Sequence, residues 1–376
     1  MKPRIAILTN YPLNNKDFVG GVGTASVGLV SSLMAYTGEF NFHVITLSRK
    51  ADRDINCKHN GINFHYLTVK RLLRPRFTFF LLNVLKNLHH IKPDLIHCQD
   101  NTILATATLL SKIKSVFTVH GVKQAEARVW GRLKGKPGVF LDAEAQKYIF
   151  SRFRNIIAIS PYVANFMPEG KRVFNIPNPV SDIFFQPEPD NPPTPGKYVV
   201  YAGALTPLKR PEDILLSAEI LQRKESDLQF IFCGSGDRAY INKLKKQTKE
   251  LNLKDIHFTG HITQEKLKSY IQHAKALILP STQENSPMVI AEAMVLGTPV
   301  IATNVGGIPY MIENMRTGIL YQPGDITGLA KHIRELLSNT DLWSDISKKA
   351  QLEARNKYSP ENVADMTVNV YRKLLN

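Results

Sequence analysis

The sequence has little cysteine, few acidic residues for its length and no long apolar run. Its 376 residues include three cysteines, Cys57, Cys98 and Cys233, which lie far apart and form no Cys-x-x-Cys pair. This distribution argues against a disulfide framework or a zinc site and favours a cytoplasmic protein with reduced thiols. No apolar stretch approaches the ~20 residues of a membrane-spanning helix. If the protein works at a membrane, we therefore expect it on the surface.

The shortage of acidic residues leaves a large positive charge. Lys and Arg total 48 and Asp and Glu total 32, which gives a formal net charge of +16. Such an excess favours anionic partners, namely nucleotide phosphates, acidic lipid surfaces or nucleic acid, although it also serves plain solubility. The sequence contains no recognisable nucleic-acid-binding module, so we expect no nucleic-acid partner.

Short apolar runs alternate with longer amphipathic segments along most of the chain. Continuous short runs predict strands that are buried on both faces, and helices between them imply right-handed crossovers in parallel sheets. The predicted strands are residues 5–8, 42–47, 62–67, 95–97, 116–119, 156–159, 198–202, 229–233, 256–259, 276–279 and 300–302. The pattern predicts an α/β protein with two Rossmann-like, doubly wound domains.

A proline-rich segment interrupts this pattern. Residues 186–197 read QPEPDNPPTPGK, and proline restricts both its own backbone and the residue before it. We therefore assign residues 1–185 to an N-terminal domain, 186–197 to a linker and 198–357 to a C-terminal domain. Residues 358–376 predict a helix that we expect to pack back on the N-terminal domain.

Ligands of doubly wound sheets bind at the carboxyl ends of the strands, and the candidate loops all follow predicted strands. In the first half, GGVG at residues 20–23 opens a helix, where glycines and free amides suit an anion, although the segment is equally a flexible turn. His120 ends the strand 116–119, where it can donate a hydrogen bond or share a proton. A lone histidine is, however, more often structural.

In the second half, a strand ends at Gly203, and Lys209 and Arg210 stand just before a helix that begins with Pro211. The two cations can neutralise a diphosphate, with roughly 1.5–3 kcal/mol for each charge-assisted hydrogen bond, or they form a solvated basic turn. FCGSGD at residues 232–237 either lines a base or ribose pocket or is only a tight turn.

The strongest signal is the segment 277–302, which reads as strand, loop, helix and strand. Glu284 lies in the loop and Glu292 lies inside the helix among apolar residues, where a charge is costly unless it has a partner. One carboxylate can hold a ribose diol and the other a sugar hydroxyl. Ser286 is predicted as the N-cap and Pro287 as the first helical residue. Phosphate is then expected at the helix start, which comprises Ser286, Pro287, Met288 and Val289. After the last strand, TNVGGIP at 303–309 is expected to add backbone amides.

The segment QENSPMVIAEAMVLGTPVIATNVGGIP resembles the signature region of the family-4 retaining glycosyltransferases, in which two Rossmann-like domains form the GT-B architecture with a donor cleft between them. The Glu-x7-Glu pair matches at Glu284 and Glu292. The resemblance extends to GGVG, FTVHG, NIPNPV, AGALTPLKRPEDIL, FCGSGD and TGILYQPGD, and so it covers nearly the whole chain.

The resemblance implies a role for each matching residue. Glu292 would bind the ribose hydroxyls, Glu284 the donor sugar and Lys209 the diphosphate. His120 would lie beside the transferred sugar, and Gly21, with Gly23, near the phosphates. The first domain would be the acceptor side and the second the nucleotide-sugar side.

As a reaction, the resemblance implies metal-independent, cofactor-free hexosyl transfer from a UDP- or GDP-sugar to a glycan or lipid-linked acceptor, in surface polysaccharide or lipopolysaccharide biosynthesis. Two alternatives remain, a nucleotide-sugar epimerase of the same architecture and an inactive nucleotide-sugar-binding subunit.

The sequence departs from the family pattern in three places. Ala204 stands where many members have an arginine, and we expect Arg210 to supply that charge. Ala25 replaces a histidine after the first glycine pair, and Tyr310 replaces an acidic residue after GGIP. The acidic triplet at residues 52–54 has the Asp-x-Asp form of a metal-binding motif, but its charged surroundings predict plain surface.

A basic cluster precedes aromatic residues near position 76. The aromatic residues are Phe77, Phe79 and Phe80, and the basic residues are Lys70, Arg71, Arg74 and Arg76. The cluster suits docking on an anionic bilayer, at ~1 kcal/mol per basic residue, on the inner face of the membrane. It is equally consistent with a core helix that follows a basic loop.

Overall fold

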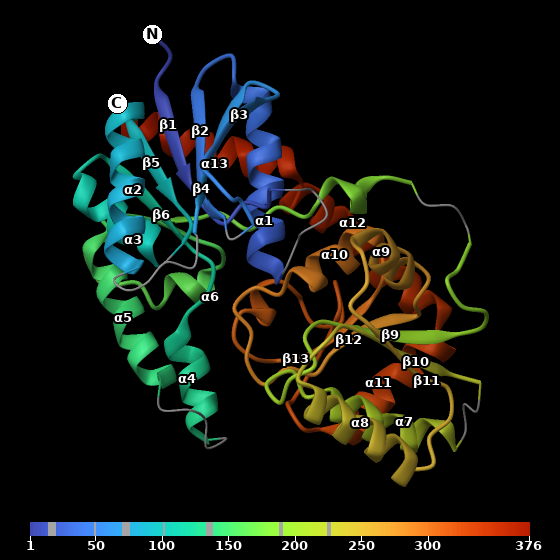
Figure 1. Cartoon of the computed structure of the whole chain (residues 1–376). Coiled ribbons are helices and arrows are strands. Elements are labelled where there is room, and N and C mark those ends of the chain that lie inside the picture. The colour runs from blue at the N-terminus through green and yellow to red at the C-terminus, as the bar shows by residue number, and fades with distance from the viewer. Residues whose placement is uncertain are drawn as a thin grey trace. The chain divides into compact units, whose positions relative to one another are not determined.

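The computed structural model of the chain describes residues 1–13, 20–48, 50–69, 76–100, 102–132, 138–187, 191–223 and 227–376. It divides into two compact units (Figure 1). The first unit comprises residues 1–127, 136–181 and 360–376, and the second comprises residues 128–135 and 182–359.

The first unit contains an eight-stranded sheet in the order β3-β4-β2-β1-β5-β6-β7-β8. All of its strand pairs are parallel except β3 with β4. The strands are β1 (Arg4–Leu8), β2 (Asn41–Ser48), β3 (Ile55–His59), β4 (Ile62–Thr68), β5 (Leu95–Cys98), β6 (Ser115–Val119), β7 (Asn155–Ala158) and β8 (Arg172–Asn175). The predicted strands of this half are confirmed. The edge strands β3 and β8 were not predicted, because their largely exposed residues form no apolar run.

Alternate residues of these strands build two hydrophobic cores, one on each face of the sheet. Ala6 and Leu8 of β1 face a core with α2 (Arg76–Ile91), α3 (Ile103–Ser111) and α5 (Gly138–Arg152). Ile5 and Ile7 face the other core. That core includes residues of α1 (Gly20–Ser32), which continues as the 3-10 helix η1 (Leu33–Tyr36), and of the final helix α13 (Pro360–Leu375). The remaining helices are α6 (Pro161–Ala164) and α4 (Lys123–Arg132), whose residues from 128 onward group with the second unit.

The second unit contains a six-stranded, all-parallel sheet in the order β11-β10-β9-β12-β13-β14. The strands are β9 (Tyr198–Ala202), β10 (Gln229–Cys233), β11 (Ile256–Gly260), β12 (Ala276–Leu279), β13 (Val300–Thr303) and β14 (Ile319–Tyr321). The helices are α7 (Pro211–Gln222), α8 (Arg238–Glu250), α9 (Gln264–Gln272), α10 (Met288–Leu296), α11 (Ile326–Ser338) and α12 (Thr340–Lys357), with the short 3-10 helix η3 (Ile308–Tyr310). The predicted strands of this half are confirmed, and only the three-residue β14 was not predicted.

The boundary between the units differs slightly from the expected one. The 3-10 helix η2 (Asp182–Phe185) groups with the second unit, although we had placed it in the N-terminal domain. Its residue Phe184 is fully buried, and η2 packs against α9 and α10. Next to it, the buried ammonium of Lys268 donates a hydrogen bond of 2.9 Å to the carbonyl oxygen of Gln186. These contacts hold the start of the linker, at Gln186, against the second unit.

Within the described residues, none of the helices combines the length and the apolar character that crossing a bilayer requires.

Candidate functional site

The strand order of the second sheet reverses at β9, whose neighbours are β10 on one side and β12 on the other. In doubly wound sheets such a reversal opens a crevice outside the carboxyl ends of the strands, where ligands bind. The loops that leave β9 and β12 meet there, because both the amide and the hydroxyl of Thr282 donate to the carbonyl oxygen of Leu208, at 2.8 and 3.0 Å.

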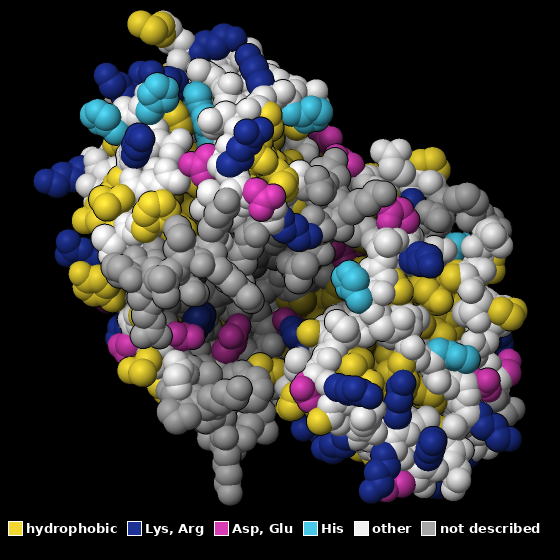
Figure 2. Space-filling view, in the orientation of Figure 1, with side chains coloured by type: hydrophobic (Ala, Val, Ile, Leu, Met, Phe, Trp, Pro, Cys, Tyr) yellow, Lys and Arg dark blue, Asp and Glu magenta, His cyan; other side chains and the backbone are white. Residues whose placement is uncertain are grey.

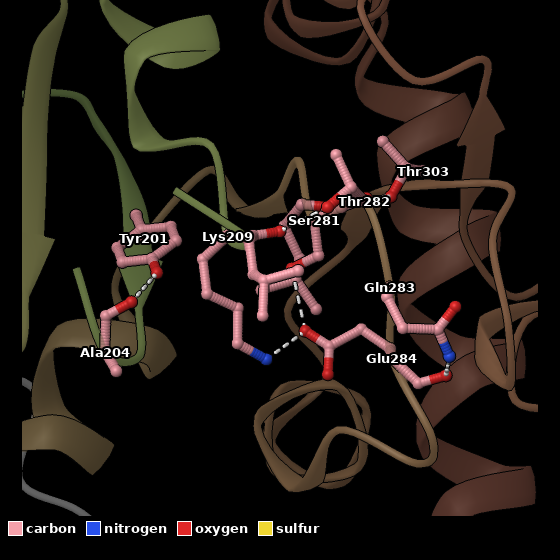
Figure 3. A network of polar contacts seen from close by, with 10 residues as sticks. Tyr201, Ala204, Lys209, Ser281, Thr282, Gln283, Glu284 and Thr303 are labelled. Atoms are coloured by element: carbon pink, nitrogen blue, oxygen red, sulfur yellow. Dashed lines mark hydrogen bonds and ion pairs between the residues drawn. The ribbon is translucent and has the colours of Figure 1, made fainter. Parts of the chain in front are cut away.

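An ion pair joins these two loops (Figure 3). The ammonium of Lys209 lies 2.5 Å from Oε1 of Glu284, and the hydroxyl of Ser281 donates to the same oxygen at 2.7 Å. The Glu284 side chain is 7% exposed, whereas that of Lys209 is 28% exposed. Glu284 is therefore held inside the loop, while its cation still reaches solvent and can bind a second anion.

Glycines around this pair allow the loops to touch backbone to backbone. A Cβ on Gly234 would lie 1.9 Å from the carbonyl oxygen of Gly203, and one on Gly236 would lie 2.1 Å from that of Leu205. A Cβ on Gly307 would lie 1.8 Å from the carbonyl oxygen of Asn285. FCGSGD and TNVGGIP are thus rich in glycine because they support the loops that follow β9 and β12.

The amide of Gly307 is also engaged in this packing. It donates a hydrogen bond of 2.9 Å to the carbonyl oxygen of Glu284. Our expectation that TNVGGIP presents its amides to a ligand is therefore wrong for Gly307, because the neighbouring loop already uses that donor.

Arg210 is tied to its own helix. It adopts a left-handed conformation with φ 47° as the N-cap of α7, and its guanidinium donates two hydrogen bonds, of 2.8 and 2.6 Å, to the fully buried Asp213. Asp213 thus already engages the guanidinium. That Arg210 supplies the charge missing at Ala204 stays a prediction.

Glu292 lies inside α10 and is 6% exposed. Among the described residues none donates a hydrogen bond to its carboxylate, and burial raises its pKa to about 7. An acidic side chain in this state lacks a partner that a polar ligand can supply.

The start of α10 differs from the prediction by one residue. Pro287 is the N-cap, with an extended ψ of 115°, and Met288 is the first helical residue, followed by Val289. Ser286 was wrongly predicted as the N-cap, since its hydroxyl lies instead 3.6 Å from Sδ of Met311. Gly297 ends the helix with φ 81°, in the left-handed region that glycine favours.

The first unit holds the remaining candidates. His120 follows β6, and within the described residues neither of its buried ring nitrogens has a hydrogen-bond partner of normal geometry. Burial lowers the pKa of His120 to about 4, and the nearby Asn178 amide opposes that shift only in part, so the imidazole is neutral at pH 7. Asn178 belongs to the NIPNPV stretch after β8, and its place beside His120 was missed because the sequence did not predict β8.

The glycine-rich segment at residues 20–23 forms the first turn of α1 and not a loop before it. Gly21 lies within that turn, and among the described residues no atom lies within 4 Å of a Cβ placed on Gly23.

Two further predictions concern other surfaces. Lys70, Arg71 and Arg74 lie outside the described residues, and Arg76 begins α2. In the acidic triplet, the carboxylate of Asp54 accepts hydrogen bonds from the Thr68 amide and the Asn83 side chain, at 2.8 and 3.2 Å, which gives it a structural role.

The two halves of the chain match two family models. Residues 19–182 match "Glycosyltransferase Family 4" and residues 182–353 match "Glycosyl transferases group 1". The chain therefore belongs to the glycosyltransferases of family-4 type, and its two parallel-sheet domains are those of the GT-B fold.

Particular relatives agree with this membership. The chain is 31% identical over 176 residues to 2-deoxystreptamine N-acetyl-D-glucosaminyltransferase of Niallia circulans, a match that covers 46% of this chain and 45% of that protein. Sucrose-phosphate synthase of Thermosynechococcus elongatus has the same fold, with a TM-score of 0.80, 20% identity and 99% of both chains covered. Anabaena HepE, solved in complex with UDP-glucose, has a TM-score of 0.75 at 18% identity, with 98% of this chain and 99% of that chain covered. These relatives give no support to the epimerase alternative.

The backbone contact at Gly307 yields a stability prediction. Gly307→Ala places a methyl group on the Asn285 carbonyl, so the loop must shift. We expect the free energy of unfolding to fall by about 1–3 kcal/mol, measured by urea denaturation. Gly38→Ala is the matched control, because a Cβ there meets nothing within 4 Å. Equal stability of the two variants would contradict the packing role.

The raised pKa of Glu292 yields a prediction about pH. Between its ordinary value of 4.5 and about 7, the folded state keeps a proton that the unfolded chain releases. Stability therefore falls as pH rises through this window and levels off above it. Relative to Glu292→Gln, the wild type should lose about 2–3 kcal/mol of unfolding free energy between pH 5 and pH 8. Parallel pH curves from urea titrations of the two proteins would contradict the assignment.

Proposed function

We propose that this chain transfers a sugar from a UDP- or GDP-sugar to a glycan or lipid-linked acceptor, with retention of anomeric configuration and without a metal ion. The observation that carries the proposal is the arrangement at the strand-order reversal of the second sheet. There the Lys209–Glu284 pair lies at the loops, and Glu292 lies in α10 with no partner among the described residues. Membership of the glycosyltransferases supports the reaction class, and the complex of HepE with UDP-glucose supports the donor class.

Lys209 is suited to the diphosphate. Its ammonium has three donors, and within the described part of the chain its acceptor is Oε1 of Glu284. A diphosphate oxygen that enters beside Glu284 accepts a hydrogen bond from another N–H of the Lys209 ammonium. This contact weakens the ion pair between Lys209 and Glu284. Glu284 is then free to accept a hydrogen bond from a sugar hydroxyl and so to orient the sugar of the nucleotide-sugar.

Glu292 is suited to the ribose. A diol donates two hydrogen bonds to one carboxylate, and each offsets part of the burial cost that raises the Glu292 pKa. We therefore infer that nucleotide binding lowers this pKa and favours the ionised form. Met288 and Val289 at the start of α10 present helix-terminal amides of the kind that bind phosphate.

The chemical step asks for positioning and charge balance more than for covalent work by the protein. The bond between the anomeric carbon and the diphosphate oxygen breaks, and an acceptor oxygen bonds to the same face of that carbon. The acceptor proton passes to a phosphate oxygen of the leaving group. We propose that neutral His120 donates a hydrogen bond to the transferred sugar and that Lys209 balances the charge developing on the diphosphate.

A panel of UDP- and GDP-sugars, scored by thermal stabilisation and by nucleotide release with and without glycan acceptors, tests the reaction class. Acceptor-dependent release supports transfer. Interconversion of free nucleotide-sugars without acceptor would instead support the epimerase, and binding without any turnover would support an inactive subunit.

Removal of the proposed donor contacts should weaken nucleotide affinity. We expect Lys209→Ala and Glu292→Ala each to raise the Kd for UDP or GDP about 10- to 100-fold, the loss of a charge-assisted hydrogen bond. Calorimetric titration measures this. Lys349→Ala, which breaks the exposed pair with Asp345, is the control. Unchanged affinity in both site variants would refute the assignment.

We also propose that the first unit docks on the inner face of a membrane through α2. Phe77, Phe79 and Leu82 are 51%, 53% and 60% exposed on this helix, directly after the basic segment. Figure 2 shows hydrophobic side chains at the surface of the first unit among basic and histidine side chains. Such a surface suits anionic lipid, where a lipid-linked acceptor is found.

Flotation with phosphatidylglycerol vesicles tests this docking. The wild type should float at low salt and detach at high salt, because electrostatic attraction is screened. Phe77→Ser combined with Phe79→Ser should lose most of the binding. Leu352→Ser, which alters a residue on α12 that is 79% exposed, should retain it. A wild type that stays with the unbound fraction at low salt would end the idea.

A further inference from the structure

A layer of polar side chains caps one face of the first sheet, at the carboxyl ends of β1, β5 and β6. Deeper on this face the residues are apolar and form the core with α1 and α13. Strand residues two positions apart share a face. On this face, Ile7, Leu95 and Val116 of the core are each followed two positions later by a polar residue. The polar layer comprises Thr9, His97, Gln99, Thr118 and His120.

The first chain of hydrogen bonds in this layer begins on α13. The hydroxyl of Tyr371 lies 2.6 Å from Nδ1 of His97, and Nε2 of His97 lies 2.6 Å from the hydroxyl of Thr118. His97 and Tyr371 are 1% and 0% exposed. Burial lowers the pKa of His97 to about 3, so its ring is neutral, and one nitrogen donates while the other accepts. The final helix is thereby fixed to the strand that ends at His120.

The second set of hydrogen bonds fixes α1. Oε1 of Gln99 accepts from the hydroxyl of Ser26 at 2.9 Å and lies 3.3 Å from the hydroxyl of Thr9. The two hydroxyl oxygens lie 2.7 Å apart. Ser26 belongs to α1, so the helix that begins with the glycine-rich turn is held to the ends of β1 and β5.

Between these two sets lies a small cavity of about 20 Å³. Its polar lining includes His97, Gln99, Thr118, His120 and Asn178, and α13 contributes Thr367. The ring nitrogens of His120 are buried and make no hydrogen bond of normal geometry among the described residues. Within the part of the chain that the structure describes, the orientation of this imidazole therefore depends on the side chains that line the cavity.

We propose that Tyr371 and His97 are positioning residues for His120. The hydroxyl of Tyr371 holds His97, His97 holds Thr118, and Thr118 precedes His120 by two residues on the same side of the strand. The final helix thus takes part in the site, although it is 274 residues from His97 in sequence. The inference rests on the proposed function, in which His120 contacts the transferred sugar.

A spectroscopic test needs no substrate. In protein labelled with 15N histidine, the His120 ring signals are identified by their loss in His120→Ala. We expect Tyr371→Phe to shift these signals. Tyr198→Phe should leave them in place, because it removes an equally buried hydroxyl, bonded to the Tyr270 carbonyl oxygen, from the other unit. His120 signals that do not move in Tyr371→Phe would overturn the proposal.

Turnover of UDP-glucose, followed by UDP release, gives the functional comparison. Tyr371→Phe should lower kcat about three- to tenfold, the equivalent of one hydrogen bond, and leave the affinity for UDP unchanged. In the His120→Ala background the same change should have no further effect. A repeated loss in that background would show a general structural role and overturn the proposal.

The outcomes also separate this inference from the proposed function. If His120→Ala turns over normally, the role of His120 fails and the inference fails with it. If His120→Ala is impaired but Tyr371→Phe is not, only the inference fails. Should Tyr371→Phe not fold, Thr118→Val removes the hydroxyl at the opposite end of the chain of hydrogen bonds and permits the same comparison.

Discussion

The reversal of strand order at β9 is the constraint on which the proposed donor site depends. Because all the strands of the second sheet are parallel, their carboxyl ends share one edge, and the loops after β9 and β12 diverge from neighbouring strands into the same space. Lys209 and Glu284 are 75 residues apart in sequence, yet this topology brings them into contact. The backbone contacts of Gly234, Gly236 and Gly307 then fix the positions of these two loops relative to the sheet.

Glu284 and Glu292 differ in their electrostatic environments. Glu284 has a cation and a hydroxyl as partners, so its charge is balanced before any ligand arrives. Glu292 has no such partner among the described residues, and its carboxylate bears the cost of burial. The same residue type thus serves once as part of a preformed ion pair and once as a buried, destabilised group that the proposed nucleotide would relieve. Destabilisation of this kind is common where a protein keeps a binding group ready.

The sequence allowed prediction of the elements whose signal is local. Continuous apolar runs identified the central strands, and Pro211 marked the start of a helix. The polar edge strands β3 and β8 were missed because pairing with a neighbour, and not their own composition, makes them strands. The hydrogen bonds between Arg210 and Asp213 could not be predicted, since the sequence does not show whether a guanidinium binds a nearby carboxylate or a diphosphate. The cavity beside His120 is lined by six separate segments of the chain, and no periodicity in the sequence reports such contacts.

The place of α13 in the first unit also has a consequence for synthesis on the ribosome. Residues from Val363 to Leu374 complete a core whose other members include Ile5, Ile7 and Leu95. The early strands therefore leave the exit tunnel long before the helix that covers them, while every strand of the second unit emerges ahead of it. The half that is translated first is therefore the one whose core is completed last, because α13 emerges after the whole second unit.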